Sequence, residues 1–290
     1  MSPIRVLAVD DSALMRNMLS AVVNQQPDME MAGTAPDAFI ARELIKQLNP
    51  DVLTLDIDMP RMDGLEFLSR LMRLRPMPVI MISSLTTRGS KATLSALEHG
   101  AVDFLPKPEH RAAENIESWG QQVVEKIRIA ARAKLNLRSQ RTRPILAGIP
   151  VRQQSIIAIG SSTGGTEALR QVLMPLPVST PGIVIAQHMP SGFTHSFAQR
   201  LDSLCQIAVR EAQDGEPVLP GTALIAPGDR HMEIIGQDNG YRVRLSDAPA
   251  VNRHRPSVDV LFDSVARQAS KHASAALLTG MGADGARGLL

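Results

Sequence analysis

Residues 156–165 read Ile156-Ile157-Ala158-Ile159-Gly160-Ser161-Ser162-Thr163-Gly164-Gly165, and this segment gives the clearest indication of how the second half of the chain folds. A short apolar run followed by glycines is typical of a buried strand that turns sharply into a helix. The pattern Gly-x-Ser-x-Gly then exposes the hydroxyl of Ser162 beside backbone N–H groups that can stabilise an oxyanion. Glycine-rich turns also cradle phosphates, but this one lacks the G-x-G-x-x-G fingerprint and the lysine of a P-loop. A serine nucleophile is therefore favoured, and a nucleotide-binding output module stays as an alternative.

Similar apolar runs alternate with helical patterns in both halves, which is typical of parallel sheets covered on both faces. We therefore expect an α/β protein. The expected strands are 5–9, about 29–32, 52–55, 79–82 and 102–105 in the first half, and 156–159, 183–186, 207–210, 223–226, 232–235, 241–245 and 275–278 in the second. The first-half helices are expected at 14–23, 39–48, 65–74, 92–97 and about 114–135. The turn at Asp238-Asn239-Gly240 predicts a β-hairpin between 232–235 and 241–245.

A length of 290 residues favours two domains. From residue 126 to 152 the chain carries eight basic residues and no acidic one. We expect a first domain at 1–125, a basic linker at 126–153 and a second domain at 154–290.

Composition excludes several classes of protein. The net charge of +2 is too small to indicate nucleic-acid binding. No signal peptide is visible, and no segment approaches the ~20 apolar residues of a membrane span, which predicts no membrane insertion. The lone Cys205 cannot form an internal disulfide, so a reducing, cytoplasmic location is expected, with Cys205 as core filler.

Carboxylates follow two expected strands of the first half. Asp10 and Asp11 end the first strand and Asp56 ends the third, so a parallel sheet would bring them together at its carboxyl edge. Such a cluster repels itself unless a cation is present, and Mg²⁺ suits a site made of oxygen ligands. Ser83 and Lys107 follow the next two strands and supply a hydroxyl and a positive charge for a phosphoryl group.

Two more strand ends of the second half carry groups that fit a serine nucleophile. His188 follows the strand at 183–186 as a candidate base, and Asp284 follows the strand at 275–278 as a candidate to orient that base. A simple helix N-cap is the alternative for Asp284. The order Ser, His, Asp along the chain differs from that of α/β-hydrolases, which predicts a parallel-sheet fold distinct from theirs.

The first half resembles response-regulator receiver domains over about residues 3–125. The motifs that carry the resemblance are Asp10-Asp11, Asp56-Ile57-Asp58-Met59-Pro60, Met62-Asp63-Gly64, Ser83-Ser84 and Lys107-Pro108. The resemblance implies a flavodoxin-like (βα)5 fold in which Asp56 is phosphorylated in the presence of Mg²⁺.

The same resemblance implies individual roles. Asp11 and Asp56 would bind Mg²⁺ with the backbone carbonyl of Asp58, and Asp10 would act through water. Ser83 and Lys107 would sense the phosphoryl group. Phe104 stands where the family has a switch aromatic, a role that is compatible with burial in the core.

The second half resembles the catalytic domain of the CheB family. The motifs are Gly160-Ser161-Ser162-Thr163-Gly164-Gly165-Thr166, Gln187-His188-Met189-Pro190, His254-Arg255-Pro256-Ser257-Val258-Asp259 and Thr279-Gly280-Met281-Gly282-Ala283-Asp284-Gly285. The resemblance implies Ser162 as nucleophile, His188 as base and Asp284 as orienting carboxylate. Thr163 and Met281 would supply oxyanion-hole donors, and residues 254–259 would line or support the site. Ser161 departs from the alanine that is frequent in the family, and a structural role is expected for it.

With both domains, the resemblance implies a phosphorylation-regulated hydrolase in bacterial chemotaxis. It would demethylate glutamate methyl esters on methyl-accepting chemoreceptors, releasing methanol, and deamidate glutamines, with no cofactor for hydrolysis. The histidine kinase CheA would be the phosphoryl donor. Family members continue for several tens of residues past the last triad element, so a C-terminally truncated form is expected. The alternative is an impaired enzyme that acts as a phospho-responsive receptor-binding protein.

Overall fold

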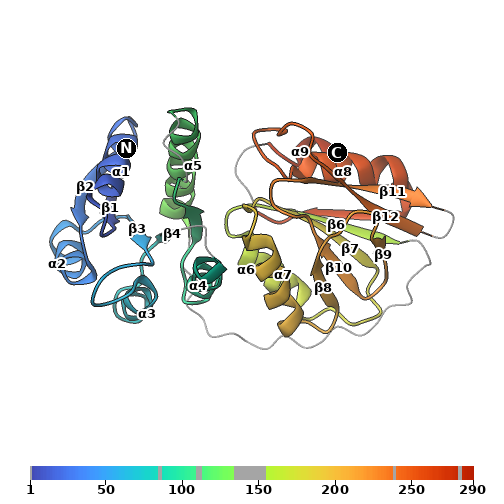
Figure 1. Ribbon diagram of the computed structural model, residues 1–290, viewed down its shortest axis with the longest axis horizontal. Coiled ribbons are helices and arrows are strands. Elements are labelled where there is room, and N and C mark those ends of the chain that lie inside the picture. The colour runs from blue at the N-terminus through green and yellow to red at the C-terminus, as the bar shows by residue number, and fades with distance from the viewer. Residues whose placement is uncertain (1, 84–86, 109–112, 134–154, 238–239, 280–282) are drawn as a thin grey trace. The chain divides into compact units, whose positions relative to one another are not determined.

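The computed structural model describes residues 2–83, 87–108, 113–133, 155–237, 240–279 and 283–290, which form two compact units divided between Ser139 and Gln140 (Figure 1). The predicted domain boundaries at 125 and 153 stay predictions. The last helix of the first unit continues past residue 126 to Arg132. Among the described residues, no helix has the length and apolarity that a bilayer span requires.

The first unit is built on a parallel five-stranded sheet with the order β2-β1-β3-β4-β5. Its strands are β1 (Ile4–Val9), β2 (Met29–Ala35), β3 (Val52–Asp56), β4 (Val79–Ser83) and β5 (Asp103–Pro106). All five strands that the sequence predicts are present, with ends shifted by a few residues. The doubly wound order confirms the flavodoxin-like fold.

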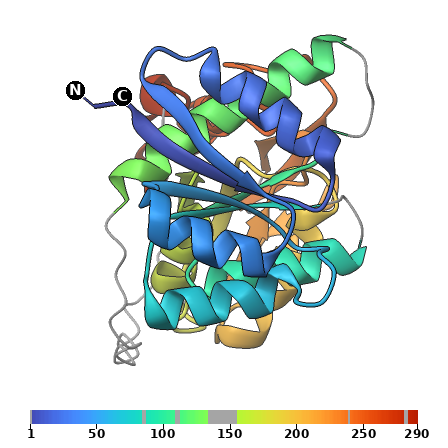
Figure 2. The same ribbon diagram turned by 90° about the vertical axis from the view of Figure 1, so that its left-hand side faces the viewer.

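Helices cover both faces of this sheet. They are α1 (Ala13–Asn24), α2 (Ala38–Leu48), α3 (Gly64–Leu74), α4 (Thr87–Glu98) and α5 (Ala113–Arg132). Figure 1 and Figure 2 show α1 and α5 on one face and α2, α3 and α4 on the other. Three of these helices begin at side-chain caps, because Ser12, Asp37 and Asp63 each accept a hydrogen bond from a backbone N–H of the first turn.

The second unit has its own parallel sheet with the order β13-β6-β7-β10-β8. Its strands are β6 (Ile156–Ser161), β7 (Gly182–Gln187), β8 (Ala208–Glu211), β10 (Thr222–Ile225) and β13 (Ala273–Leu277). Its helices are α6 (Gly165–Leu173), α7 (Phe193–Leu204), α8 (Val258–Ala269) and α9 (Ala286–Leu289), with a 3₁₀ turn at Ser270–His272. In Figure 1, α6 and α7 lie on one face of the sheet, and α8 and α9 lie on the other.

The predicted hairpin is confirmed by the antiparallel pairing of β11 (His231–Gln237) with β12 (Gly240–Ser246). The strand β9 (Pro217–Val218) pairs with β12 and extends the hairpin to a three-stranded sheet. A two-residue strand is too short for an alternation pattern, so the sequence does not predict it. Apolar side chains of β11, β12 and α8 share one buried core with β6, β7 and β10.

The strand order places three carboxyl ends side by side. The chain begins the sheet at β6, adds β7 on one side and returns to add β13 on the other. The strand order therefore reverses at β6, with β7 on one side of it and β13 on the other. Loops at such a switch point diverge to opposite faces and leave a crevice above the sheet, which is where ligands bind in open α/β sheets.

Candidate active site

The loops after β6, β7 and β13 bring together the three residues that the sequence nominates for catalysis. The hydroxyl oxygen of Ser162 lies 3.1 Å from Nδ1 of His188. Nε2 of the same ring lies 2.7 Å from Oδ2 of Asp284. The three side chains therefore form one continuous hydrogen-bonded chain from hydroxyl to imidazole to carboxylate.

The turn that carries Ser162 follows directly from the glycines in its sequence. Gly164 has a φ of +75°, a backbone conformation that glycine adopts without steric cost, and the helix α6 begins at the next residue. A Cβ at Gly165 would lie 2.1 Å from Oε1 of Gln187 and 2.8 Å from Cβ of Ser161, so only glycine allows the helix to start this close to the strands. The hydroxyl of Ser162 consequently stands at the amino end of a helix.

Among the described residues, the Thr163 amide makes no hydrogen bond. It lies directly after Ser162 and ahead of α6, where an unpaired N–H can stabilise negative charge on a reacting oxygen. Met281, the second oxyanion-hole donor that the family resemblance implies, lies outside the described residues.

Asp284 is held by several donors besides His188. Its Oδ1 accepts from Oγ of Ser257 at 2.7 Å and from Nδ2 of Asn252 at 2.8 Å, and its Oδ2 accepts from the backbone N–H of Val258 at 2.8 Å. Burial raises the pKa of this carboxyl, but the hydrogen bonds from His188, Ser257, Asn252 and Val258 outweigh burial and hold its pKa well below the usual range. Asp284 is therefore an ionised partner for the imidazole.

The N-cap alternative for Asp284 is partly realised, at a different helix from the one expected. The cap of the following helix α9 is Gly285. The carboxylate of Asp284 instead meets the first backbone N–H groups of α8, at Val258 and Asp259. The positive end of the α8 dipole therefore adds to the stabilisation of its charge.

Gln187 connects the two strand ends that carry Ser162 and His188. Its Nε2 donates to the carbonyl oxygen of Ser162 at 3.0 Å and to that of His188 at 3.2 Å. Its Oε1 accepts from the hydroxyl of Ser161 at 2.6 Å, so every hydrogen-bonding atom of this amide is used. Ser161 is fully buried, and the structural role expected for it is this contact with Gln187.

Sequence reasoning did not nominate Gln187 or Asn252 individually. Both are amides whose partners are distant along the chain, 25 residues for Gln187 and Ser162 and 32 for Asn252 and Asp284. Gln187 lies within a quoted motif, beside the candidate base. Nothing in the local pattern distinguishes Asn252 from an ordinary turn residue.

The first unit assembles its own carboxylate cluster. Ligand oxygens of Asp10, Asp11 and Asp56 lie within 4.8 Å of one another at the carboxyl ends of β1 and β3. Nζ of Lys107 lies 2.8 Å from Oδ2 of Asp56 and 2.9 Å from Oδ2 of Asp10. Burial, together with the charge of Asp10, raises the pKa of Asp56 to about 6, even though Lys107 acts to lower it.

The cluster fits a magnesium ion. The second oxygen of Asp56, Oδ1, is buried and has no hydrogen-bond partner among the described residues, which is the situation of a metal ligand. The donor set is made of carboxylate oxygens, as Mg²⁺ prefers.

The other residues that the sequence nominates in this domain differ in burial. Asp58 is exposed and Ser83 is fully buried at the end of β4. Phe104 is buried, with 4% of its surface exposed.

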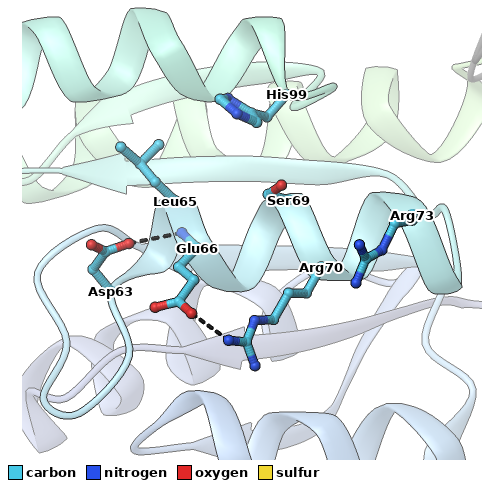
Figure 3. Close-up of a pocket in the computed structure, with 7 residues that line it drawn as sticks. All are labelled: Asp63, Leu65, Glu66, Ser69, Arg70, Arg73 and His99. Atoms are coloured by element: carbon cyan, nitrogen blue, oxygen red, sulfur yellow. Dashed lines mark hydrogen bonds and ion pairs between the residues drawn. The ribbon is translucent and has the colours of Figure 1, made fainter.

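A polar hollow of about 440 Å³ lies along α3, beside His99, which directly follows α4 (Figure 3). It is lined by Asp63, Leu65, Glu66, Ser69, Arg70, Arg73 and His99. Figure 3 shows Glu66 paired with Arg70, and Asp63 bonded to the first turn of α3. Its lining contains none of the residues that the sequence nominates for a site.

Comparisons with known proteins agree with both halves of this description. A model of the CheB methylesterase family matches residues 157–290, and a model of the response regulator receiver domain matches residues 6–116. The chain is 59% identical over 292 residues to the protein-glutamate methylesterase/protein-glutamine glutaminase of Shigella flexneri and to that of Escherichia coli strain K12. Each alignment covers 100% of this chain and 84% of the relative.

Two solved structures from Thermotoga maritima are similar to the two units. The CheB methylesterase catalytic domain is 44% identical, with a TM-score of 0.45, and the match covers 47% of this chain and 73% of that one. The CheB response regulator domain is 44% identical, with a TM-score of 0.42, and the match covers 46% of this chain and 98% of that one. On the family matches and the full-length identity, the chain belongs to the CheB family, with a receiver domain followed by a methylesterase domain.

Proposed function

We propose that this chain is a protein-glutamate methylesterase and protein-glutamine glutaminase that acts on chemoreceptors. The single observation that carries the proposal is the continuous contact from Ser162 through His188 to Asp284. The 59% sequence identity of this chain with curated enzymes of that name supports the choice of substrate.

In the proposed reaction, Ser162 Oγ attacks the carbonyl carbon of a glutamate methyl ester while Nδ1 of His188 takes its proton. The Thr163 amide then stabilises the oxygen of the tetrahedral intermediate. Nδ1 returns the proton to the methoxy oxygen, which leaves as methanol, and a glutamyl ester remains on Ser162. Water, deprotonated by His188, hydrolyses this ester to a glutamate carboxylate and the free serine.

Deamidation follows the same path with ammonia as the leaving group, because a glutamine side chain gives the identical glutamyl-serine ester. Asp284 keeps the imidazole in the tautomer that carries a proton on Nε2, and it balances the charge that the ring acquires. A receptor-binding protein without catalysis, the alternative that the sequence leaves open, is not favoured, because the three groups are in contact.

We also propose that phosphorylation of Asp56 by a chemotaxis histidine kinase regulates this activity. Mg²⁺ held by Asp10, Asp11 and Asp56 would neutralise the charge of the incoming phosphoryl group. Lys107, which contacts Asp56, would pair with a phosphoryl oxygen there. The roles of Asp58, Ser83 and Phe104 in coordination and switching stay predictions.

The test is methanol release from a methylated receptor fragment, measured with and without Mg²⁺ and a small acyl phosphate as phosphoryl donor. We expect Ser162→Ala to abolish release, and Ser203→Ala, which removes an exposed hydroxyl on α7, to leave it unchanged. Undiminished release by Ser162→Ala excludes the nucleophile. Equal rates of methanol release by wild type with and without the phosphoryl donor exclude regulation by phosphorylation. The rate of Asp56→Asn should not change when the donor is added.

A further inference from the structure

A tight turn at Val251–His254 lies against the proposed catalytic residues. The backbone N–H of each end residue donates to the carbonyl of the other, at 3.1 Å and 2.9 Å. The two central residues, Asn252 and Arg253, have φ angles of 52° and 66°. Asparagine tolerates the left-handed conformation, but it is uncommon for arginine and persists there where the surrounding structure requires it.

This turn supplies contacts to two of the three proposed catalytic residues. The ring of His254 is stacked on the ring of His188, with centroids 3.7 Å apart and planes 11° from parallel. The amide of Asn252 donates to Asp284 at 2.8 Å and to Asp259 at 2.9 Å. The two side chains leave the same turn, so a single element contacts the imidazole and its carboxylate together.

The stacking of His254 on His188 matters because both ring nitrogens of His188 make hydrogen bonds to the other two proposed catalytic residues. Rotation of the ring about the bond to Cβ would break the contacts with Ser162 and Asp284 at the same time. The two hydrogen bonds hold the ring only at its two nitrogens, and neither contacts the face of the ring. A parallel ring at van der Waals distance blocks one direction of tilt, and stacked aromatic rings attract each other beyond the effect of the area that they bury.

We propose that His254 is a positioning residue, which holds the plane of the His188 ring by stacking while its own turn fixes Asp284 through Asn252. This inference rests on the proposed hydrolase function. His254 acts through His188 and has no covalent or proton-transfer step of its own. The property that matters is the flat face of its side chain.

The experiment compares His254→Phe, which keeps a flat ring, with His254→Leu, which fills similar space without one. The matched control is His272→Leu, at the other end of β13 from the catalytic loop. Two readouts are measured on the full chain: kcat and KM for methanol release, and the rate at which an uncharged phosphonate ester labels Ser162. The second readout needs no receptor.

We expect His254→Phe to stay within about threefold of wild type in both readouts. His254→Leu should lose roughly 10- to 100-fold in kcat and in labelling, with KM within about twofold, because small misplacements of catalytic groups cost up to about 100-fold. His272→Leu should match wild type. Melting temperatures are measured for all variants, and His254→Met replaces His254→Leu where the latter does not fold.

Each of three results would overturn the proposal. Equal labelling of wild type and His254→Leu means that the ring does not position His188. A loss in His254→Phe as large as in His254→Leu means that the nitrogens of His254, and not its face, are required. A change in KM alone, with labelling unchanged, assigns His254 to the substrate. If wild type releases no methanol, the proposed function fails, and the labelling comparison still decides the inference.

Discussion

The imidazole of His188 meets Ser162 through Nδ1, the ring nitrogen nearer the main chain, and meets Asp284 through Nε2. In the chymotrypsin-type triad the two nitrogens have the opposite roles. Because Asp284 is ionised and can only accept, the proton of the neutral ring resides on Nε2. The lone pair of Nδ1 is then directed at the hydroxyl of Ser162, as a general base requires.

Replacing Asp284 with asparagine should lower kcat by about 10³- to 10⁴-fold, because an amide does not select the tautomer protonated on Nε2. KM should change little, since Asp284 is buried behind His188. The measurement is the initial rate of methanol release from a methylated receptor fragment. Asp247→Asn, on an exposed aspartate paired with Arg230, is the control and should stay within about twofold of wild type. Retention of more than a tenth of kcat by Asp284→Asn would contradict the assignment.

The stability of the second domain should depend on pH through Asp284. A carboxyl whose pKa is lower in the folded state than its unfolded value of 3.8 stabilises the fold above pH 3.8. That stabilisation is lost as the pH falls below 3.8 toward the folded pKa. Urea unfolding should therefore show wild type more stable than Asp284→Asn at pH 5, with a smaller margin near pH 3. A margin independent of pH over this range would refute the role of the charge.

Ser161→Ala should separate the two adjacent serines. The substitution leaves Oε1 of the buried Gln187 without its donor, at a cost of about 1–3 kcal/mol in the free energy of unfolding. Nε2 of Gln187 keeps its contacts with the carbonyls of Ser162 and His188, so kcat should stay within about tenfold of wild type. Urea titration and methanol release measure the two effects. Complete loss of activity in a folded Ser161→Ala protein would mean that this hydroxyl takes part in the reaction.

Gln187→Leu provides the contrasting variant. It removes the amide that joins the two strand ends and leaves the carbonyl oxygens of Ser162 and His188 without that donor. We expect a larger decrease in both stability and kcat than in Ser161→Ala. The reverse order would show that the hydroxyl of Ser161, and not the amide, holds the loops together.

The strand ends were predictable because their signals are local. An apolar run followed by Asp56, Ser162 or His188 predicts both a buried strand and a polar group at its carboxyl edge. The parallel sheet then brings such edges together without any further information. This is why the positions of the proposed catalytic residues follow from sequence, while the two-residue strand β9 does not.

The supporting contacts were not predictable in the same way. Asn252 is 32 residues from Asp284 in sequence, and it meets this carboxylate where the first turn of α8 also donates to it. The choice of ring nitrogen at His188 is likewise set by side-chain rotation in three dimensions. Sequence patterns predict which residues arrive at the site, and side-chain packing decides how they meet.

Asp56→Asn should make the receiver domain more stable than wild type without Mg²⁺, and added Mg²⁺ should remove most of that difference. Burial and Asp10 raise the pKa of Asp56 in the fold to about 6, so the fold loses stability as the pH rises from 3.8 through 6. In Mg²⁺-free buffer at pH 7.5, the free energy of unfolding of Asp56→Asn should therefore exceed that of wild type by on the order of 3 kcal/mol. Added Mg²⁺ should stabilise wild type, by about 2.7 kcal/mol at 100 times its Kd, and should stabilise Asp56→Asn much less.

Fluorescence of Trp119 reports the unfolding of the receiver domain alone, because Trp119 is the only tryptophan in the sequence. Its side chain is buried in that domain and donates a hydrogen bond to the carbonyl of Pro106. Asp28→Asn is the control. Asp28 directly precedes β2, and its half-exposed carboxylate pairs with Arg128, so its loss should change the free energy of unfolding little and leave the response to Mg²⁺ intact. An equal response to Mg²⁺ in wild type and Asp56→Asn would place the ion elsewhere, because the substitution removes a carboxylate whose buried oxygen has no other described partner.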